Sequence, residues 1–212
     1  MLLIGMYDSP YVRRVAIGMH LCGIAFEHAD WSVGADFERI RQYNPLARVP
    51  TLVLDDGDVL LDSAALLDYL DELVGPQRAL LPRVGRERRT GLRLMALASG
   101  AADKGREQIY ERAFRPVQKR HEPWLARCRM QMHGALSELE RHADARGSGR
   151  WLLGERLTHA DIMVVCAFSF LCEALALGAQ AAPYPALSAL TARCEALPEF
   201  QSTRVEFAVP QS

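Results

Sequence analysis

The alternation of short apolar runs with helical patterns, and its loss near residue 80, constrains the fold of this 212-residue chain more than any other feature. Before that point the order is strand, helix, strand, helix, hairpin and helix, which is typical of a small α/β domain. Beyond it, apolar residues recur only at helical spacing. Pro and Gly gather in residues 75–85, which indicates a linker. We therefore predict an α/β domain at residues 1–76, a linker at 77–85 and an all-helical domain at 86–212.

The first domain opens with an apolar run, Leu2–Ile4, that is typical of a buried strand, and a helix follows it. Ser9 is a residue type that caps helices, and Pro10 is favoured at the first helical position. A second extended run covers residues 25–31, and a short polar helix is predicted at 37–43.

A hairpin and a third helix complete the predicted α/β domain. The turn sequence at residues 55–58 contains Asp-Gly between the apolar runs 51–54 and 59–61, which is a strong hairpin signal. Ser63 is predicted to cap the helix that follows, and Gly75 to end it.

The second domain contains one helix with no polar face. Residues 162–171 are apolar on nearly all sides, so this helix is expected in the middle of a helical bundle. Thr158 and Asp161 are spaced as a capping box, in which each side chain bonds the backbone N–H of the other. The predicted role of this box is in folding, not in catalysis.

The charge balance excludes several classes of partner. Lys and Arg number 25 against 26 Asp and Glu, a formal net charge of −1, so we expect neither nucleic acid nor an anionic membrane surface as a partner. The apolar stretch 162–172 is far shorter than the about 20 residues of a membrane span. No cationic segment followed by an apolar run opens the chain, so a cytoplasmic protein is predicted.

The cysteines and histidines show no metal-binding pattern. Five scattered cysteines without a C-x-x-C motif indicate reduced thiols, mostly in the core, instead of disulfides or zinc ligands. Six histidines lack the spacing of metal ligands, so no metal is predicted.

Ser9 is the first candidate for chemistry. A hydroxyl at the start of a helix, directly after a buried strand, lies among unpaired backbone N–H groups and at the positive end of the helix dipole. Such a position stabilises an anion. Because residues 9–12 contain no cysteine, this site cannot carry out dithiol exchange itself, but it can hold the thiolate of another molecule. The alternative is that Ser9 is only an N-cap.

Val49-Pro50 and Asp62-Ser63 are the other candidates. A cis bond before Pro50 would leave the backbone N–H and C=O of Val49 free to pair with an extended peptide, whereas an ordinary trans proline is the commoner case. The helix N-terminus at Ser63 is suited to a carboxylate, and Asp62 to an amine. The alternative for this pair is an ordinary helix cap with an acidic neighbour.

Together these elements fit a thiol-containing tripeptide, and the motifs resemble those of a soluble, bacterial-type glutathione S-transferase with a serine-type active site. The resemblance rests on S-P-Y-V-R-R-V (Ser9–Val15), N-P-L-A-R-V-P-T-L (Asn44–Leu52), L-L-D-S-A-A (Leu60–Ala65) and L-T-H-A-D-I (Leu157–Ile162). It implies a thioredoxin-like α/β N-terminal domain followed by an all-α C-terminal helical bundle domain.

The resemblance also implies a role for each matching residue. Ser9 corresponds to the catalytic serine that donates a hydrogen bond to the glutathione sulfur. Val49 corresponds to the residue whose backbone pairs with the cysteinyl part, with Pro50 as the cis proline. Glutathione is thus the expected co-substrate, together with a small electrophilic molecule.

The ends of glutathione have their own expected partners. Asp62 and Ser63 correspond to the pair that holds the γ-glutamyl end, and Arg48 to a position that reaches the glycyl carboxylate. Family members usually form homodimers, and Asp103 lies on the helix that often contributes an acid to the partner's site.

The acceptor site and the exact reaction are less constrained. Four aromatic residues are candidates for an acceptor pocket, with core packing as the alternative: Tyr7, Tyr11, Tyr110 and Phe114. Arg13 and Arg14 are interpreted mostly as a solvated face, although either could neutralise a ligand carboxylate. Transfer to an electrophile is the first hypothesis, and the alternatives are a glutathione-dependent isomerase, dehalogenase or peroxidase, or a non-enzymatic binding or regulatory protein.

Overall fold

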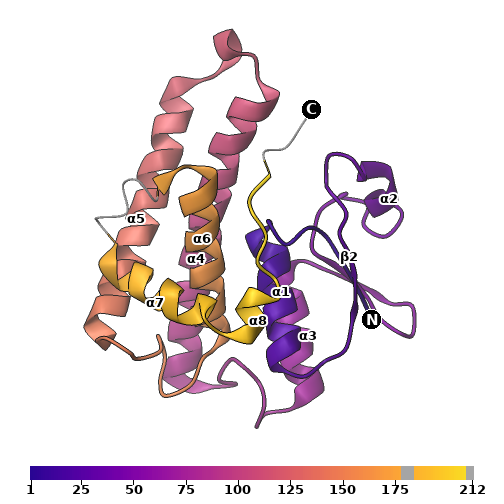
Figure 1. The fold of residues 1–212 in the computed structure, drawn as a ribbon, viewed down its shortest axis with the longest axis vertical. Coiled ribbons are helices and arrows are strands. Elements are labelled where there is room, and N and C mark those ends of the chain that lie inside the picture. The colour runs from indigo at the N-terminus through magenta and orange to yellow at the C-terminus, as the bar shows by residue number, and fades with distance from the viewer. Residues whose placement is uncertain (178–183, 209–212) are drawn as a thin grey trace.

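A small mixed β-sheet with helices forms the N-terminal domain in the computed structural model, which describes residues 1–177 and 184–208 (Figure 1). Its elements in chain order are β1 (Leu2–Ile4), α1 (Pro10–Leu21), β2 (Glu27–Ala29), α2 (Phe37–Arg41), β3 (Thr51–Val53), β4 (Val59–Leu61) and α3 (Ser63–Val74). The strand order is β2-β1-β3-β4; β1 is parallel to β2 and antiparallel to β3, and β3 is antiparallel to β4. This order is that of a thioredoxin-like domain, and the predicted hairpin is confirmed as β3–β4.

All the regular elements in the described part of the C-terminal domain are helices. Its elements are α4 (Gly85–Phe114), the 3-10 turn η1 (Val117–Lys119), α5 (Glu122–Arg146), α6 (His159–Ala174), α7 (Pro185–Glu195) and α8 (Pro198–Gln201). Helices α4 and α5 are long and run side by side, whereas α6 packs between α4 and α1. The all-apolar helix predicted at residues 162–171 is α6, and all of these residues except Ser169 are buried.

The two domains share one apolar core. In Figure 1, α1 and α3 lie between the sheet and the helical domain, and α1 packs on α6. Val15 and Ala16 of α1 and Ile162 and Val165 of α6 are all fully buried in one continuous cluster. The position of α1, and of every residue at its N-terminus, is therefore set by both domains.

Arg13 is a second tie between the domains, and its place corrects the prediction that it is solvated. Its two terminal nitrogens donate to the two carboxylate oxygens of Glu195 at 2.8 and 2.6 Å, and one also donates to the C=O of Phe200 at 3.0 Å. The side chain is buried because α1 faces the helical domain on this side instead of solvent.

The start of α6 has the predicted capping box. Asp161 accepts the backbone N–H of Thr158 at 2.9 Å and that of Leu152 at 2.8 Å, and it is fully buried. The cysteines are all free, and four of the five are buried, as predicted for core thiols.

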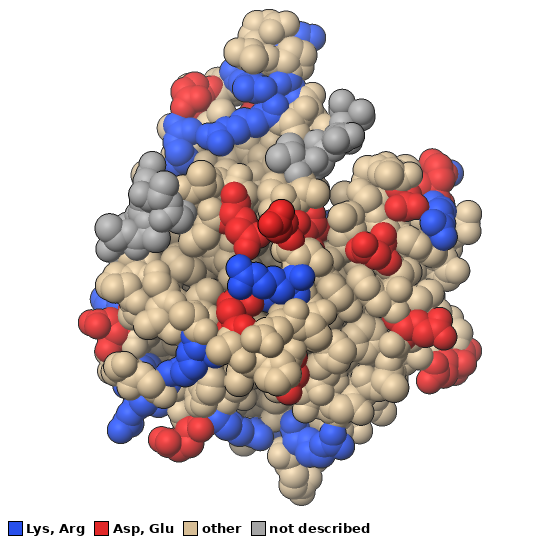
Figure 2. Space-filling model, in the orientation of Figure 1, with Lys and Arg blue, Asp and Glu red and all other residues tan. Residues whose placement is uncertain are grey.

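The surface carries both signs of charge. On the face shown in Figure 2, basic side chains gather near the tip of the two long helices, whereas acidic and basic side chains are mixed over the rest. Within residues 1–177 and 184–208, no helix is both long enough and apolar enough to cross a membrane.

Candidate functional site

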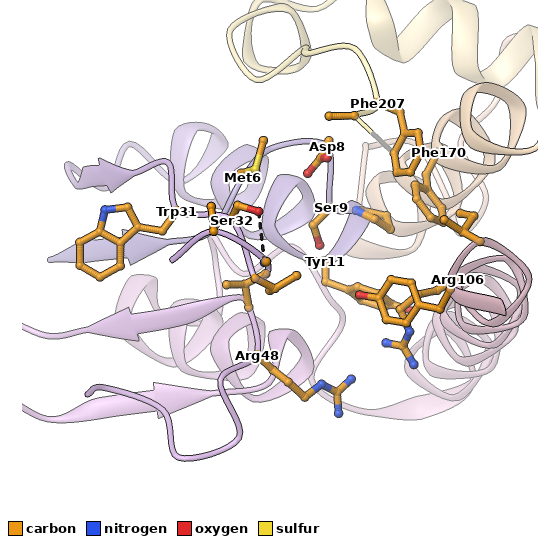
Figure 3. Close-up of a pocket in the computed structure, with 18 residues that line it drawn as sticks. Met6, Asp8, Ser9, Tyr11, Trp31, Ser32, Arg48, Arg106, Phe170 and Phe207 are labelled. Atoms are coloured by element: carbon orange, nitrogen blue, oxygen red, sulfur yellow. Dashed lines mark hydrogen bonds between the residues drawn. The ribbon is translucent and has the colours of Figure 1, made fainter. Parts of the chain in front are cut away.

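Two adjoining cavities lie where the N-terminal end of α1 meets the helical domain. The larger has a volume of about 550 Å³ and the smaller about 300 Å³. Tyr11, Arg48 and Val49 line both of them, so the cavities form one site with two compartments. The larger compartment is lined by the start of α1 and the segment before it, by residues 31–35 after β2, and by the loop before β3. Helices α4 and α6 and the C-terminal segment supply the other side (Figure 3).

Ser9 is half-buried and lines the larger cavity. It is the N-cap of α1, and its hydroxyl oxygen accepts the N–H of Val12 at 3.5 Å. That distance is longer than an ordinary hydrogen bond, so the capping contact is weak. Because the hydroxyl only accepts in this contact, its O–H remains available to donate to a ligand. Ser9 is therefore a cap and a cavity residue at once.

The bond between Val49 and Pro50 is cis. The side-chain amide of Asn44 donates to the C=O of Arg48 at 2.8 Å and to the hydroxyl of Thr51 at 3.1 Å, which holds this loop in place. Among the described residues, the backbone N–H and C=O of Val49 have no hydrogen-bond partner. The Val49 backbone, which lines both compartments, can therefore pair with an extended peptide.

Gly5 allows this loop to approach α1 closely. Its φ is +130°, and a Cβ there would lie 2.6 Å from both Val12 and Val49. Any other residue would separate the loop from the start of α1, so Gly5 sets the distance between Ser9 and the Val49 backbone.

The predicted cap at Ser63 is wrong, because Asp62 is the N-cap of α3. The Asp62 carboxylate accepts the N–H of Ala64 at 2.8 Å, and its backbone has φ 71° and ψ 125°, a conformation that costs free energy in a non-glycine residue. Ser63 is the first residue of the helix and is buried. Both residues line the smaller cavity, beside Pro50.

Arg14 is a site residue that the sequence analysis placed on a solvated face. It is 3% exposed, lines the smaller cavity, and donates to the Ser63 hydroxyl at 2.5 Å. Its Nε is buried with no partner among the described residues. Burial lowers the pKa of the Arg14 guanidinium, although the nearby Asp62 carboxylate opposes that shift. The sequence gives no indication that Arg14 is buried beside α3, because its position on α1 is equally compatible with an exposed side chain.

Arg48 and Asp103 lie at the boundary of the two compartments. Arg48 is exposed and lines both of them. Asp103, on α4, lines the smaller one and accepts the O–H of Tyr11 at 2.8 Å. Burial, with Asp103 adding to it, raises the pKa of Tyr11 far above neutrality, so this phenol stays protonated. The homodimer, and a role of Asp103 across it, stay predictions.

Two of the four candidate aromatic residues line the larger cavity, namely Tyr11 and Tyr110. Tyr7 does not, because its ring turns toward β2 and stacks on His28 at 3.9 Å. Phe114 does not either, because it ends α4 one turn beyond Tyr110 and packs against the edge of that ring at 5.1 Å.

Residues from loops, from α4 and α6, and from the C-terminal segment supply the rest of this wall. They are Met6, Trp31, Ile109, Phe170 and Phe207 among others. Phe170 and Phe207 pack edge to face at 5.5 Å. Ile109 adjoins Tyr110 on one helix, but no sequence pattern connects the others.

Asp8 is an acidic group beside Ser9 in the larger cavity. Burial raises its pKa, and the Asp30 carboxylate adds to this, although backbone N–H groups of Ala208 and Ser9 oppose it. In the part of the chain that the structure describes, no three His, Cys, Asp or Glu side chains gather as metal ligands.

A thioredoxin-like domain, an all-helical domain and a two-compartment cavity at the start of the first helix define the class of two-domain, glutathione transferase-like proteins. The comparisons agree with this class. Models of the glutathione S-transferase N-terminal and C-terminal domains match residues 3–78 and 122–193. The chain is 34% identical over 172 residues to an uncharacterized GST-like protein, YibF, of Escherichia coli K12, a match that covers 81% of this chain and 82% of that protein. The chain belongs to the glutathione S-transferase family.

Two further similarities bear on the site. A crystal structure of a glutathione S-transferase from Methylobacterium radiotolerans, in complex with glutathione sulfonate, superposes with a TM-score of 0.87 at 30% identity, covering 100% of this chain and 95% of that one. A probable maleylacetoacetate isomerase of Drosophila melanogaster is 27% identical over 176 residues, which are 78% of this chain and 63% of that protein.

Proposed function

We propose that this protein is a glutathione S-transferase in which the Ser9 hydroxyl stabilises the glutathione thiolate. The observation that carries the proposal is the position of Ser9, which lies at the N-terminus of a twelve-residue helix and lines a cavity that also contains the unpaired backbone of Val49. The relative from Methylobacterium radiotolerans holds glutathione sulfonate, which supports glutathione as the ligand here.

The proposed position of glutathione follows from the two compartments. Its cysteinyl backbone pairs with Val49, its sulfur points to Ser9, and its glycyl carboxylate is within the range of Arg48. Its γ-glutamyl end occupies the smaller compartment, where Asp62 receives the amine and the N-terminus of α3 at Ser63 receives the carboxylate. Arg14 adds a positive charge directly behind Ser63.

The energetics of thiolate formation require no general base. A free thiol has a pKa of about 8.5, and lowering it by about two units takes ~2.7 kcal/mol of preferential binding to the anion. A hydrogen bond to a charged group contributes ~1.5–3 kcal/mol, and a helix N-terminus ~0.3–1 kcal/mol more. Ser9 and α1 together therefore suffice. The thiolate then attacks an electrophilic carbon held against the helical domain.

The test is Ser9→Ala, assayed with chlorodinitrobenzene and with the ultraviolet absorbance of the bound thiolate. We expect kcat/KM to fall by about 10- to 100-fold and the pKa of the bound thiol to rise toward its free value, because one charge-assisted hydrogen bond is lost. The matched control is Ser32→Ala, which removes another hydroxyl from the same cavity. Unchanged turnover and an unchanged thiol pKa in the Ser9 variant would remove this residue from the mechanism.

A glutathione-dependent isomerase is the second candidate function, and the similarity to a probable maleylacetoacetate isomerase favours it. In that reaction the thiolate adds to the substrate and is later expelled, so glutathione is not consumed. Cis-to-trans conversion of an unsaturated acid with glutathione at catalytic concentration would support the isomerase, whereas stoichiometric loss of free thiol would support the transferase.

A further inference from the structure

The larger cavity combines apolar walls with a cation that the proposed binding of glutathione leaves unused. Trp31, Phe170 and Phe207 contribute aromatic surface, and Arg106 enters from α4. Arg106 lines only this compartment, whereas Arg48 lines both. The charge of Arg106 therefore faces the space beside Ser9, where the second substrate must bind.

The Arg106 side chain is held in position before any ligand binds. One terminal nitrogen lies 3.2 Å from a carboxylate oxygen of Asp103, and the same oxygen accepts the O–H of Tyr11 at 2.8 Å. The guanidinium group also lies 5.9 Å from the centre of the Tyr110 ring. With 27% of the side chain exposed, the group is neither free in solvent nor fully neutralised. A guanidinium has five N–H donors, so most of them remain for a ligand.

Positive and negative side chains lie on opposite sides of the larger cavity, so they orient a charged ligand. In Figure 3, Arg48 and Arg106 lie on one side of Ser9, and Asp8 lies on the other. An anionic group on a ligand is thus attracted toward the arginines and away from Asp8. The glycyl carboxylate of glutathione is assigned to Arg48, which leaves Arg106 for a second anion.

We infer that the acceptor is an aromatic or unsaturated electrophile that carries a carboxylate, and that Arg106 pairs with this carboxylate while the apolar body lies against the aromatic wall. The inference rests on the proposed function. For an aryl chloride the reaction balances as follows: the thiolate forms a C–S bond, the C–Cl bond breaks, chloride leaves with the electron pair, and the thiol proton goes to solvent.

The experiment uses a chlorodinitrobenzoate and its methyl ester, which have the same reacting carbon and differ in charge. The measured quantity is the ratio of kcat/KM for the acid to that for the ester, each corrected for its uncatalysed reactivity. We expect a ratio above one in the natural protein and about tenfold lower in Arg106→Gln, because a charge-assisted contact to the acid is lost. Arg106→Lys should retain part of the preference.

Arg112→Gln is the matched control, because Arg112 lies on the same helix but is exposed and lines neither cavity. It should leave the ratio unchanged. A ratio near one in the natural protein, or a ratio that Arg106→Gln does not alter, would overturn the inference. So would a loss of glutathione affinity in Arg106→Gln with the ratio intact, because Arg106 would then serve glutathione. If neither compound reacts and the protein is not retained on immobilised glutathione, the proposed function itself fails.

Discussion

Two adjacent buried arginines should respond in opposite ways to the same substitution. Arg14 and Arg13 follow one another in α1, and both are less than one-tenth exposed. Arg13 has a carboxylate partner, whereas within residues 1–177 and 184–208 Arg14 has only the hydroxyl of Ser63, and its Nε has no partner there. Replacing each with Met keeps most of the side-chain volume and removes the charge.

For Arg14→Met we expect weaker glutathione binding without a loss of stability. A buried charge without a carboxylate in direct contact destabilises the folded state, and burial is the main cause of the lowered pKa of this guanidinium, against the opposing effect of Asp62. The free energy of unfolding should therefore stay within about 1 kcal/mol of the natural value or rise. The charge behind Ser63 should stabilise the γ-glutamyl carboxylate by ~1.5–3 kcal/mol, so its loss weakens binding by about 10- to 150-fold.

For Arg13→Met we expect the reverse. The substitution leaves the partly buried Glu195 carboxylate without its bidentate partner, which costs about 3 kcal/mol of stability. Glutathione affinity of the folded protein should change little, because Arg13 points to the helical domain and lines neither cavity.

Urea denaturation gives the stability of each variant, and isothermal titration calorimetry gives its glutathione affinity. The reasoning is refuted if Arg14→Met loses several kcal/mol of stability while it binds glutathione normally, because Arg14 would then be a structural residue.

Other variants test the cap of α6 within the helical domain and the Arg13–Glu195 pair between the domains. Asp161→Ala should cost about 3 kcal/mol of unfolding free energy, because the N–H groups of Leu152 and Thr158 lose their acceptor, whereas Thr158→Ala should cost only about 1 kcal/mol; thermal denaturation compares the two. Burial raises the pKa of Glu195, but the hydrogen bond and charge of Arg13 outweigh this, and the net shift is downward. The folded-state pKa of Glu195 thus lies below its unfolded value, so its stabilisation is present above about pH 4.5 and is lost as the pH falls further. Urea titrations across this range should show a steeper loss in the natural protein than in Glu195→Gln; equal slopes would argue against the pair.

The sequence predicted those elements whose signals are local. The Asp-Gly turn before Asp58 predicted the β3–β4 hairpin, and the all-apolar run of α6 predicted its central place, because both depend on neighbouring residues alone. The cap of α3 was assigned to Ser63 instead of Asp62, because the positive φ of Asp62 is imposed by the fold around it and has no sequence signal.

Site residues at the start of a helix could be predicted from the sequence. Site residues that distant segments bring together could not. Ser9, Asp62 and Ser63 lie at helix N-termini, which are recognisable in a sequence. Arg14 was interpreted mostly as solvated, with contact to a ligand carboxylate only as the alternative, because an arginine on an amphipathic helix is usually exposed. The packing of α1 against α3 and α6 buries this one. The wall formed by Trp31, Phe170 and Phe207 had no pattern, since these residues meet only in the folded chain.

The pairing of Arg13 with Glu195 and the place of Phe207 in the cavity wall bear on how the protein is made. Ribosomes release the N-terminal domain first, but its opening helix then has neither its carboxylate partner nor the last wall of the cavity. A nascent chain therefore cannot assemble the full binding site until Phe207 has been translated, and a product that ends before Glu195 leaves the Arg13 guanidinium without its carboxylate partner.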